Sequence, residues 1–483
     1  MRERRAGHVV SGLVRVAVLL CLAAPARAIA QTAPSGPVTL NGAVQAALEN
    51  YPAIKERRAR ARAEDEGIEV ARTAYLPHVD LLWQENRATA NNVFGMLFPQ
   101  AVVPPISGPV LGTRSYDSVW GSAAGVLLSW DVVDFGQRRA AVEAARARAS
   151  LAKAQSALTE LDVASAAADA FLTVLAADES VRATRANVDR LQVFADSVRT
   201  LVQNQLRPGA DQSRAEAELA VARNQVSLAV QIADVARASL ADAMGAAGAA
   251  IDLSVGGLGR IPELALAPLD LKSHPAARAG QAGVDVVRAR ERALDRAYVP
   301  HVTLQSAFAG RGTGADVPGQ PSLGGGAWLQ VPNWAVGASV TFPAFDLFSI
   351  NARKRVELQN ELAEGARYEQ TIQNLTTQEA RARALMKAAT EIATNTPVER
   401  RAATEIVRNT PIERQAATAG ESQARARYQS GLANVTEVAE AERLLAQAEA
   451  DDAVARLGVW RALLAAAQVR GDLTPFLEKT RLP

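Results

Sequence analysis

The stretch AYLPHVDL at Ala74–Leu81 decides the fold, because it returns as AYVPHVTL at Ala297–Leu304. Upstream, the prolines of YPA (Pro52) and HPA (Pro275) stand at the same distance before the proline of that stretch. Two more motif pairs follow in the same order: VVDFGQRR from Val132 with AFDLFSINARKR from Ala344, and RAEAELAVA from Arg214 with EAERLLAQA from Glu440. So many ordered matches indicate an internal duplication with a spacing of about 220 residues.

Each copy predicts the same order of elements: a helix (about 40–73 and 276–297), a strand, a polar loop, a second strand, a very long helix, a short turn and a returning helix. The first repeat covers 29–250, with strands at about 78–88 and 118–130 and a helical hairpin at about 137–246. An equatorial linker covers 251–273. The second repeat and a C-terminal tail cover 274–483, with strands at about 301–310 and 333–343 and a hairpin at about 350–470.

Residues 1–28 predict a secretory signal peptide. Three arginines among the first five residues precede an apolar run, Val16–Ala24, and the small-x-small cleavage site Ala26–Ala28. The chain's one cysteine, Cys21, lies in the apolar run. A lipoprotein reading of Cys21 is the alternative, and the bulky Leu20 before it disfavours that reading. Either way, the chain beyond the signal has no thiol for a disulfide or a thiolate metal site.

Composition favours long packed helices. A formal net charge of +2, with 22% charged residues, argues against a nucleic-acid-binding surface. Heptad spacing of apolar residues is clear at Leu161, Ala164, Ala168, Phe171 and Leu175. A helix from residue 137 to residue 204 would be about 100 Å long, which predicts a projecting coiled coil. After the signal, no run of about 18 apolar residues appears, so a membrane role would have to come from strands.

The second strand of each repeat alternates with a period of two. In the second copy, Trp334, Val336, Ala338, Val340 and Phe342 share one face, and small or weakly polar residues share the other. The first copy repeats this pattern between residues 120 and 130. A transmembrane barrel strand, with lipid outside and a lumen inside, has this pattern, and so does an ordinary half-buried sheet. The pattern alone leaves both interpretations open.

Four membrane strands per chain are too few to close a barrel, which needs at least about eight. An open sheet edge inside lipid would leave backbone groups unpaired, at several kcal/mol each. We therefore expect assembly. Three copies supply 3 × 4 = 12 strands and the same number of long helices, enough for one barrel carrying a helical tube.

With these features the sequence resembles the TolC-type outer-membrane factors over essentially the whole mature chain. The features that carry the resemblance are the duplicated YP/HP and LPH/VPH entries, WDVVDFGQRR, QLRPGADQSRAEAELA and ARYQSGLANVTEVAEAERLL. The resemblance implies an α+β membrane protein: a homotrimeric 12-stranded β-barrel, four strands per chain, continuous with a periplasmic α-helical barrel. It also implies an outer-membrane location with a large periplasmic part, surrounded by outer-membrane lipid. The function implied is a passive exit duct for efflux or type I secretion. No enzyme activity and no cofactor are implied.

The same resemblance implies partners and contact residues. A periplasmic adaptor and an inner-membrane transporter of the RND or ABC type would work with the duct. The adaptor would contact the hairpin turns, at Gly431 and Leu432 in the second repeat. The first repeat departs from the pattern, because Gln205 holds the glycine position before Leu206, and this puts the geometry of that turn in doubt.

Three acidic residues are candidates for a periplasmic gate. Glu437 and Glu440 are three apart, so they share a helix face, and they match acidic positions that line the constriction in the family. Asp211 matches another family acid near the tip. Three-fold symmetry would make each a ring of carboxylates that holds cations and repels anions. The alternative is a solvated face of an Ala/Glu/Arg-rich helix, where carboxylates are common.

Other sites and classes of protein are less well supported. His78 and His301 occupy equivalent positions in the repeats, and without a nearby cysteine or carboxylate to complete a ligand set we expect no metal there. No phosphate loop, nucleophile elbow or His-rich helix motif is present in the sequence. A periplasmic adaptor is the main alternative, but it predicts one hairpin where this chain has two. A secreted enzyme or a structural coiled-coil protein is a weaker alternative. The transported substrate is not encoded in these features.

One segment breaks the symmetry of the repeats. TEIATNTP at Thr390–Pro397 returns two heptads later as TEIVRNTP at Thr404–Pro411. The stretch between residues 346 and 431 of the second repeat exceeds its counterpart in the first, between residues 134 and 205, by the length of this repeated unit. Because the returning arms match in length, the duplicate between residues 390 and 414 is predicted to bulge or break the helix, and to have no functional role.

Overall fold

The structure is a computed structural model, and it describes residues 36–93, 108, 110–112, 114, 116–259, 270–317, 324–343, 346–394 and 435–481. The predicted signal peptide lies outside these residues. So does the duplicated segment beyond Thr394, with Gly431 and Leu432, and the predicted break therefore stays a prediction.

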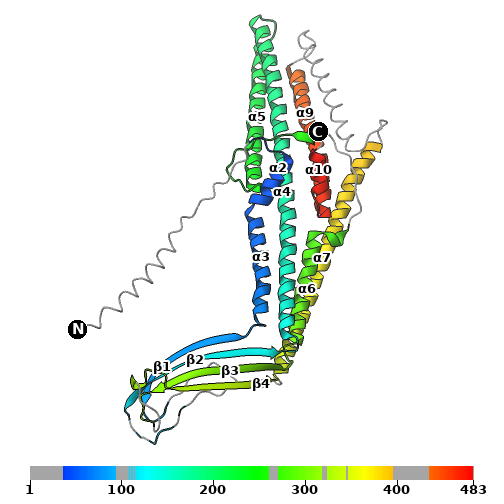
Figure 1. Ribbon diagram of the computed structural model, residues 1–483. Helices are drawn as coiled ribbons and strands as arrows, with labels where there is room; N and C mark the ends of the chain where they lie inside the picture. Colours follow the sequence, from blue (N-terminus) through cyan, green and yellow to red (C-terminus); the bar gives the residue numbers. More distant parts are fainter. Residues whose placement is uncertain are drawn as a thin grey trace, which may run out of the picture.

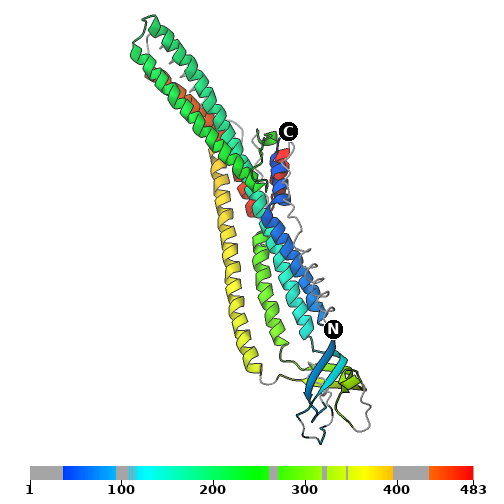
Figure 2. The ribbon, with the colours of Figure 1, turned by 90° about the vertical axis from the view of Figure 1, so that its left-hand side faces the viewer.

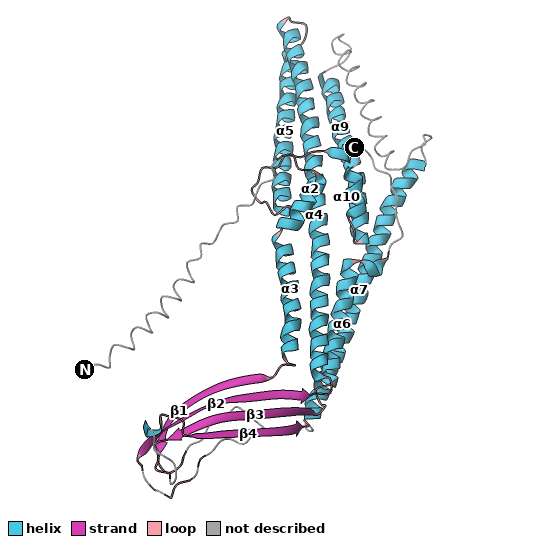
Figure 3. Ribbon diagram, viewed as in Figure 1, coloured by secondary structure: helices cyan, strands magenta, loops and turns pink. Residues whose placement is uncertain are grey.

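The strands form one four-stranded antiparallel sheet at one end of the molecule (Figures 1 and 3). They are β1 (His78–Thr89), β2 (Ser118–Val133), β3 (His301–Thr313) and β4 (Val331–Thr341), in the order β1-β2-β3-β4. The middle pair joins the two repeats: β2 lies beside β3, in a register that pairs Val126 with Phe308. Each repeat thus supplies one hairpin, and the two hairpins complete a single sheet.

Helices make up the rest of the described chain. Their bounds are α2 (Leu40–Asn50), α3 (Pro52–Thr73), α4 (Gln137–Gln203), α5 (Gly209–Ala243), α6 (Pro275–Asp295), α7 (Leu347–Thr394), α9 (Val435–Arg470) and α10 (Thr474–Arg481), with 3-10 turns η1 (Gly256–Gly259), η2 (Leu271–Ser273) and η3 (Gly324–Gly326). α4 has 67 residues and runs unbroken from the sheet to the far end of the molecule (Figure 1). At 1.5 Å per residue it is about 100 Å long. α6 runs beside α4 in the half of the molecule nearest the sheet, and α7 packs against α6 (Figure 2).

The first helix differs from the expectation of one helix over 40–73, because it is divided at Tyr51. Tyr51 has an extended backbone (φ −63°, ψ 127°), and Pro52 opens α3 at its first turn. A proline lacks the N–H that a continuing helix would need, and it disfavours a helical conformation in the residue before it. The second repeat uses the same device at its entry, where His274 precedes Pro275 at the start of α6.

The largest core lies halfway along the molecule, where α2, α4, α5, α9 and α10 meet. Phe171 and Leu172 of α4 are fully buried there, and Trp460 donates its indole N–H to the Leu258 carbonyl at 3.1 Å. The heptad residues predicted on this helix are all buried: Leu161, Ala164, Ala168, Phe171 and Leu175. This packed belt joins α2, α4 and α5 of the first repeat to α9 and α10 of the second repeat.

In both repeats, the returning helix is followed by a glycine that packs against the start of the same repeat. Gly245 follows the end of α5 and Gly471 follows the end of α9, both with positive φ (70° and 75°). In each case the glycine presses against the entry of its own repeat, Gly245 against Tyr51 and Gly471 against His274. A side chain would not fit at either place. Among the described helices, none is both long enough and apolar enough to span a membrane.

Candidate functional site

The sheet exposes a broad apolar face. Leu81, Trp83 and Trp334 are 80%, 67% and 77% exposed, and Val336, Val340 and Phe308 share that face. A folded protein in water rarely exposes so large a contiguous apolar surface. Strands that alternate apolar residues outward with small or polar residues inward are typical of a membrane barrel, so this face suits lipid.

The opposite face carries hydrogen-bonded polar side chains. Side chains alternate between the two faces along each strand, so this face carries the residues that lie between the apolar ones in the sequence. The polar pairs are His78–Asp80 (3.1 Å), Thr303–Asp131 (2.6 Å) and Gln305–Ser129 (3.2 Å). A polar face of this kind suits the water-filled interior of a channel.

Both edges of the described sheet are open. β1 pairs with β2 alone, and β4 pairs with β3 alone. Their outer backbone groups would have no partners in lipid, at several kcal/mol each. If the apolar face met lipid, both edges of this sheet would need further strands to pair with.

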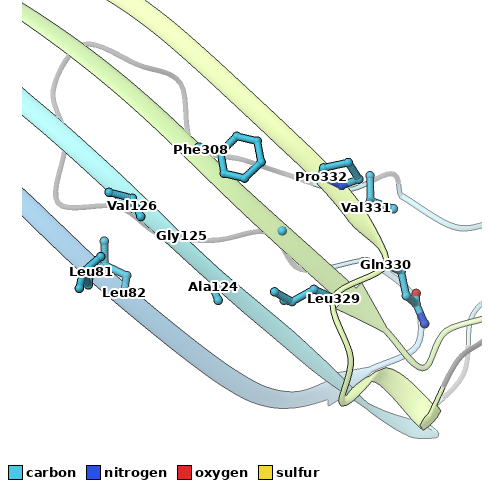
Figure 4. Close-up of a pocket in the computed structure, with 11 residues that line it drawn as sticks. Leu81, Leu82, Ala124, Gly125, Val126, Phe308, Leu329, Gln330, Val331 and Pro332 are labelled. Carbon is cyan, nitrogen blue, oxygen red and sulfur yellow. The ribbon is translucent and has the colours of Figure 1, made fainter.

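An apolar groove of about 510 Å³ crosses the lipid side of the sheet (Figure 4). Leu81, Val126 and Phe308 line it on β1, β2 and β3, and Pro332 of β4 and Leu329 just before β4 line its other side. Only one polar side chain, Gln330, lines it. The groove is part of the surface that meets acyl chains, and it carries no chemistry for binding a polar solute.

The motif WDVVDFGQRR forms the junction between sheet and helices. Asp134 accepts hydrogen bonds from the backbone N–H groups of Gly136 (3.2 Å) and Arg138 (2.6 Å) and from Arg138 Nε (2.8 Å). Arg138 also stacks on Tyr75 at 4.8 Å, which ties the start of α4 to the turn before β1. Burial alone would raise the pKa of Asp134, but these hydrogen bonds and the guanidinium charge hold it below its ordinary value.

The hairpin turn of the first repeat ends α4 in a Schellman motif. Gln205 has φ 58°, and its N–H bonds to the Val202 carbonyl, while the N–H of Leu206 bonds to the Leu201 carbonyl. Gln205 thus adopts the left-handed conformation that glycine usually supplies in this motif. Leu206 beside it is 67% exposed at the end of the molecule.

The predicted gate residues are distributed over two helices. Asp211 lies in the first turn of α5, just beyond the hairpin turn. Glu440 is exposed on α9 and forms an ion pair with Arg443 at 2.6 Å, whose hydrogen bond holds the pKa of Glu440 below its ordinary value. Val438 of α9 packs beside Ala215 of α5, so both helices reach the tip together. Glu437 lies in the first turn of α9, and its side chain is outside the described part.

A buried ion pair at the same place escapes sequence reasoning. Glu442 of α9 is completely buried, and its Oε2 lies 3.0 Å from Nε of Arg190 in α4. The two residues are 252 positions apart, so no local spacing connects them. Their charges fix the rotation of α9 against α4 close to the tip. The duplication could have suggested a contact between α4 and α9, because it predicts two helical hairpins in one chain that pack against each other.

His274 joins the start of α6 to the end of α9. Its Nδ1 accepts the N–H of Ala276 at 3.0 Å, and its Nε2 lies 3.1 Å from the Gln468 carbonyl. Both contacts are satisfied by the neutral ring with its proton on Nε2. Burial lowers the pKa of His274, although the Gln468 carbonyl and the nearby Asp162 of α4 oppose that shift. The equivalent Tyr51 makes no such cap.

The structure offers no cluster for metal chemistry among the residues it describes: no three His, Cys, Asp or Glu side chains come together there. His78 contacts Asp80 on the polar face of the sheet, and His301 lies on the same face at the start of β3. The repeated histidines therefore lie on the polar face of the sheet, and His78 has a carboxylate, Asp80, beside it.

Comparison with known sequences gives a family for the first repeat. Residues 43–246 match the sequence model of the family described as outer membrane efflux protein. A comparison with curated proteins finds no match.

The fold is that of solved outer-membrane channels. It is similar to the outer-membrane channel OprN, with TM-score 0.67, 21% identity, and 89% of this chain and 89% of that chain covered. It is also similar to CusC, solved in a study of folding and transmembrane channel formation (TM-score 0.71, 15% identity, 90% and 92% covered). A third similar structure is the open state of the Neisseria gonorrhoeae MtrE outer membrane channel (TM-score 0.68, 19% identity, 90% and 89% covered).

These findings confirm the resemblance to TolC-type outer-membrane factors and the fold class expected from it. The family match covers the first repeat, and the similarity in fold to OprN and CusC covers 89% and 90% of the chain.

Proposed function

We propose that this chain is an outer-membrane efflux channel with a large periplasmic part, and that three copies of it form the exit duct of a tripartite efflux or type I secretion system. The three sheets close into a 12-stranded barrel in outer-membrane lipid, and the helices continue it as a tube through the periplasm. The tip opens when a periplasmic adaptor and an inner-membrane transporter, of RND or ABC type, engage it. The duct itself uses no cofactor.

One observation carries this proposal: a four-stranded sheet with an exposed apolar face and two open edges is joined to a 67-residue helix. The sheet needs lipid on one side and more strands at both edges. The helix extends the duct about 100 Å away from the membrane. A periplasmic adaptor would explain a long helix in one coiled-coil hairpin, but not the sheet with its exposed apolar face.

The gate and the contact turns are assigned by the same proposal. Glu437, Glu440 and Asp211 would each form a three-fold ring of carboxylates that favours cations at the periplasmic constriction. The adaptor would bind the two hairpin turns of each chain, Gln205–Leu206 and Gly431–Leu432. The exposure of Leu206 and its place at the end of α4 support the first of these contacts.

Site-directed photo-crosslinking in cells tests the partner assignment. A photoreactive residue at Leu206 should capture an adaptor with one coiled-coil hairpin, and the captured protein shows which transporter class the duct serves. The matched control is Tyr116, fully exposed at the other end of the molecule, beside the start of β2. It should capture no periplasmic protein. Capture of the adaptor from Tyr116, or of no adaptor from Leu206 in cells that export through this duct, would overturn the assignment.

A further inference from the structure

Arg311 is a buried cation without a counter-charge among the described residues of the barrel wall. It lies on β3 near the end of the sheet that is farthest from the helices, and it is only 8% exposed. Its Nε and Nη1 atoms are enclosed and have no hydrogen-bond partner among the described residues. A guanidinium buried in this way costs several kcal/mol unless an anion neutralises it.

The surroundings of Arg311 place it on the polar, interior face of the sheet. The register pairs it with Ala123 of β2 and Val331 of β4, and alternation along β3 puts it on the same face as Gln305. Gly108, from the connection between β1 and β2, lies against Val93 and the guanidinium, and a Cβ on Gly108 would overlap Nη1. The side chain is therefore covered by closely fitting backbone, which restricts any ligand to a small ion or group.

None of these described neighbours carries a negative charge. Ala123, Val331, Val93 and Gly108 are neutral, and the carboxylates of the polar face, Asp80 and Asp131, are engaged with His78 and Thr303. An enclosed cation that no described carboxylate pairs with has the features of an anion-binding site. Arginine suits this role because its planar donors match both halides and carboxylates.

We propose that Arg311 binds a small anion, with the backbone at Gly108 as the cover of the site. The ligand is a single compact negative charge, supplied either by inorganic chloride or by the carboxylate of a small solute in the lumen. That this site lies inside a barrel rests on the proposed function. In the proposed trimer, the three copies of Arg311 would form a ring of three sites near the cell-surface opening. That ring has the opposite sign to the acidic rings proposed at the periplasmic tip, so the two ends of the duct would favour ions of opposite charge.

Thermal unfolding of the purified protein, followed by tryptophan fluorescence, tests anion binding without requiring channel activity. The wild type is compared in potassium chloride, potassium acetate and potassium gluconate at one ionic strength, since gluconate is too bulky for the site. A ligand that binds only the folded state raises the midpoint, here by about 2 °C or more in chloride or acetate. Arg311→Gln should abolish that difference. A higher midpoint in chloride alone identifies the inorganic ion as the ligand, and a higher midpoint in acetate alone identifies a carboxylate.

Arg87 provides the matched control. It is an exposed arginine of β1 at the same end of the sheet, and it stacks on Trp120 of the lipid-facing side at 5.6 Å. Arg87→Gln removes the same charge and should keep the full anion effect. If Arg311→Gln does not fold, Gly108→Ala is the second variant, because its new methyl group displaces the guanidinium and should reduce the effect.

Three results would overturn the proposal: a wild type whose midpoint is the same in all three salts, an Arg311→Gln variant that keeps the anion effect, or an Arg87→Gln variant that loses it. The first result, together with a strongly destabilised Arg311→Gln, would mean that a neighbouring copy supplies the counter-charge. Failure of the proposed trimer would appear separately, as a single-chain species on a native gel, whatever the salt does.

Discussion

The backbone of Gln205 is the most constrained position at the described tip of the molecule. Its φ of 58° lies in the left-handed region, which costs a residue with a side chain about 1–2 kcal/mol relative to glycine. Gln205→Gly should therefore stabilise the end of α4 by up to about 1 kcal/mol, because the relief of this strain exceeds the extra freedom that glycine has in the unfolded chain. Hydrogen exchange of the amides between residues 200 and 206 measures this, and it should slow.

The same substitution two residues earlier is the control. Gln203 is the last residue of α4 and has helical geometry, so Gln203→Gly should cost about 1 kcal/mol and speed exchange. Equal effects of the two variants would contradict the assignment of the left-handed turn.

The protonation of His274 should make the stability of the belt depend on pH. Burial keeps the folded-state pKa of His274 below its ordinary value of about 6.5, so the unfolded chain takes up a proton that the folded chain resists. Stability is therefore constant above about pH 6.5 and falls as the pH drops below it. Asp162 of α4, whose own pKa is raised by burial, faces the ring and reduces the size of this loss.

His274→Asn retains an acceptor for the Ala276 N–H and should flatten the pH dependence below about pH 6.5. Circular dichroism during thermal unfolding measures the midpoint across that range. His78→Asn, an exposed position on the sheet, is the control and should keep the slope. A slope that survives in His274→Asn would assign the pH dependence to another group.

At the scale of elements, the ion pair between Arg190 and Glu442 positions α9 against α4. Removing one partner of a buried ion pair typically costs about 3–5 kcal/mol, because the other charge stays buried. Glu442→Gln should therefore loosen α9 near the tip and let the duct open without its partners. The measurement is uptake of a large antibiotic by cells, which should rise well above wild type.

Two variants separate this effect from a general loss of charge. Glu216→Gln removes an exposed carboxylate of α5 close to the hairpin turn, and it should leave antibiotic uptake close to wild type because a surface ion pair contributes little. The double variant Arg190→Met with Glu442→Leu replaces the pair by apolar side chains and should restore the closed state. Uptake that rises in the double variant as much as in Glu442→Gln would contradict the account.

Local patterns in the sequence predict most of the elements but few of the contacts between them. The period of two in the strands and the heptads of α4 are local, so they can be recognised from the sequence alone. The expectation of one helix over 40–73 overlooks the break at Pro52, although proline at the start of a helix is a recognisable signal. The Arg190–Glu442 pair and the burial of Arg311 depend on how distant segments pack, which no local spacing encodes.

At the scale of the whole molecule, the duplication explains why one chain builds two hairpins on one sheet. The equivalent glycines Gly245 and Gly471 close their repeats against Tyr51 and His274. The repeats differ in how the entry is capped, because His274 caps its helix and Tyr51 does not. Symmetry could be predicted from the matching motifs, but the sheet order, with β2 beside β3, required the structure.

The central claim is that the open edges of the sheet join three copies into one closed barrel. Cysteine cross-linking tests it cleanly, since the chain's one cysteine lies in the predicted signal peptide. Leu82→Cys on β1 is combined in turn with Asn333→Cys, Ala335→Cys or Gly337→Cys on β4, all on the interior face of the sheet.

The decisive measurement is the size of the oxidised products on a denaturing gel without reductant. The account predicts that at least one pair forms a ladder of one, two and three chains that stops at three and collapses to one chain with reductant. A ladder that continues beyond three chains, or no cross-link for any pair, would contradict closure of the barrel by three copies.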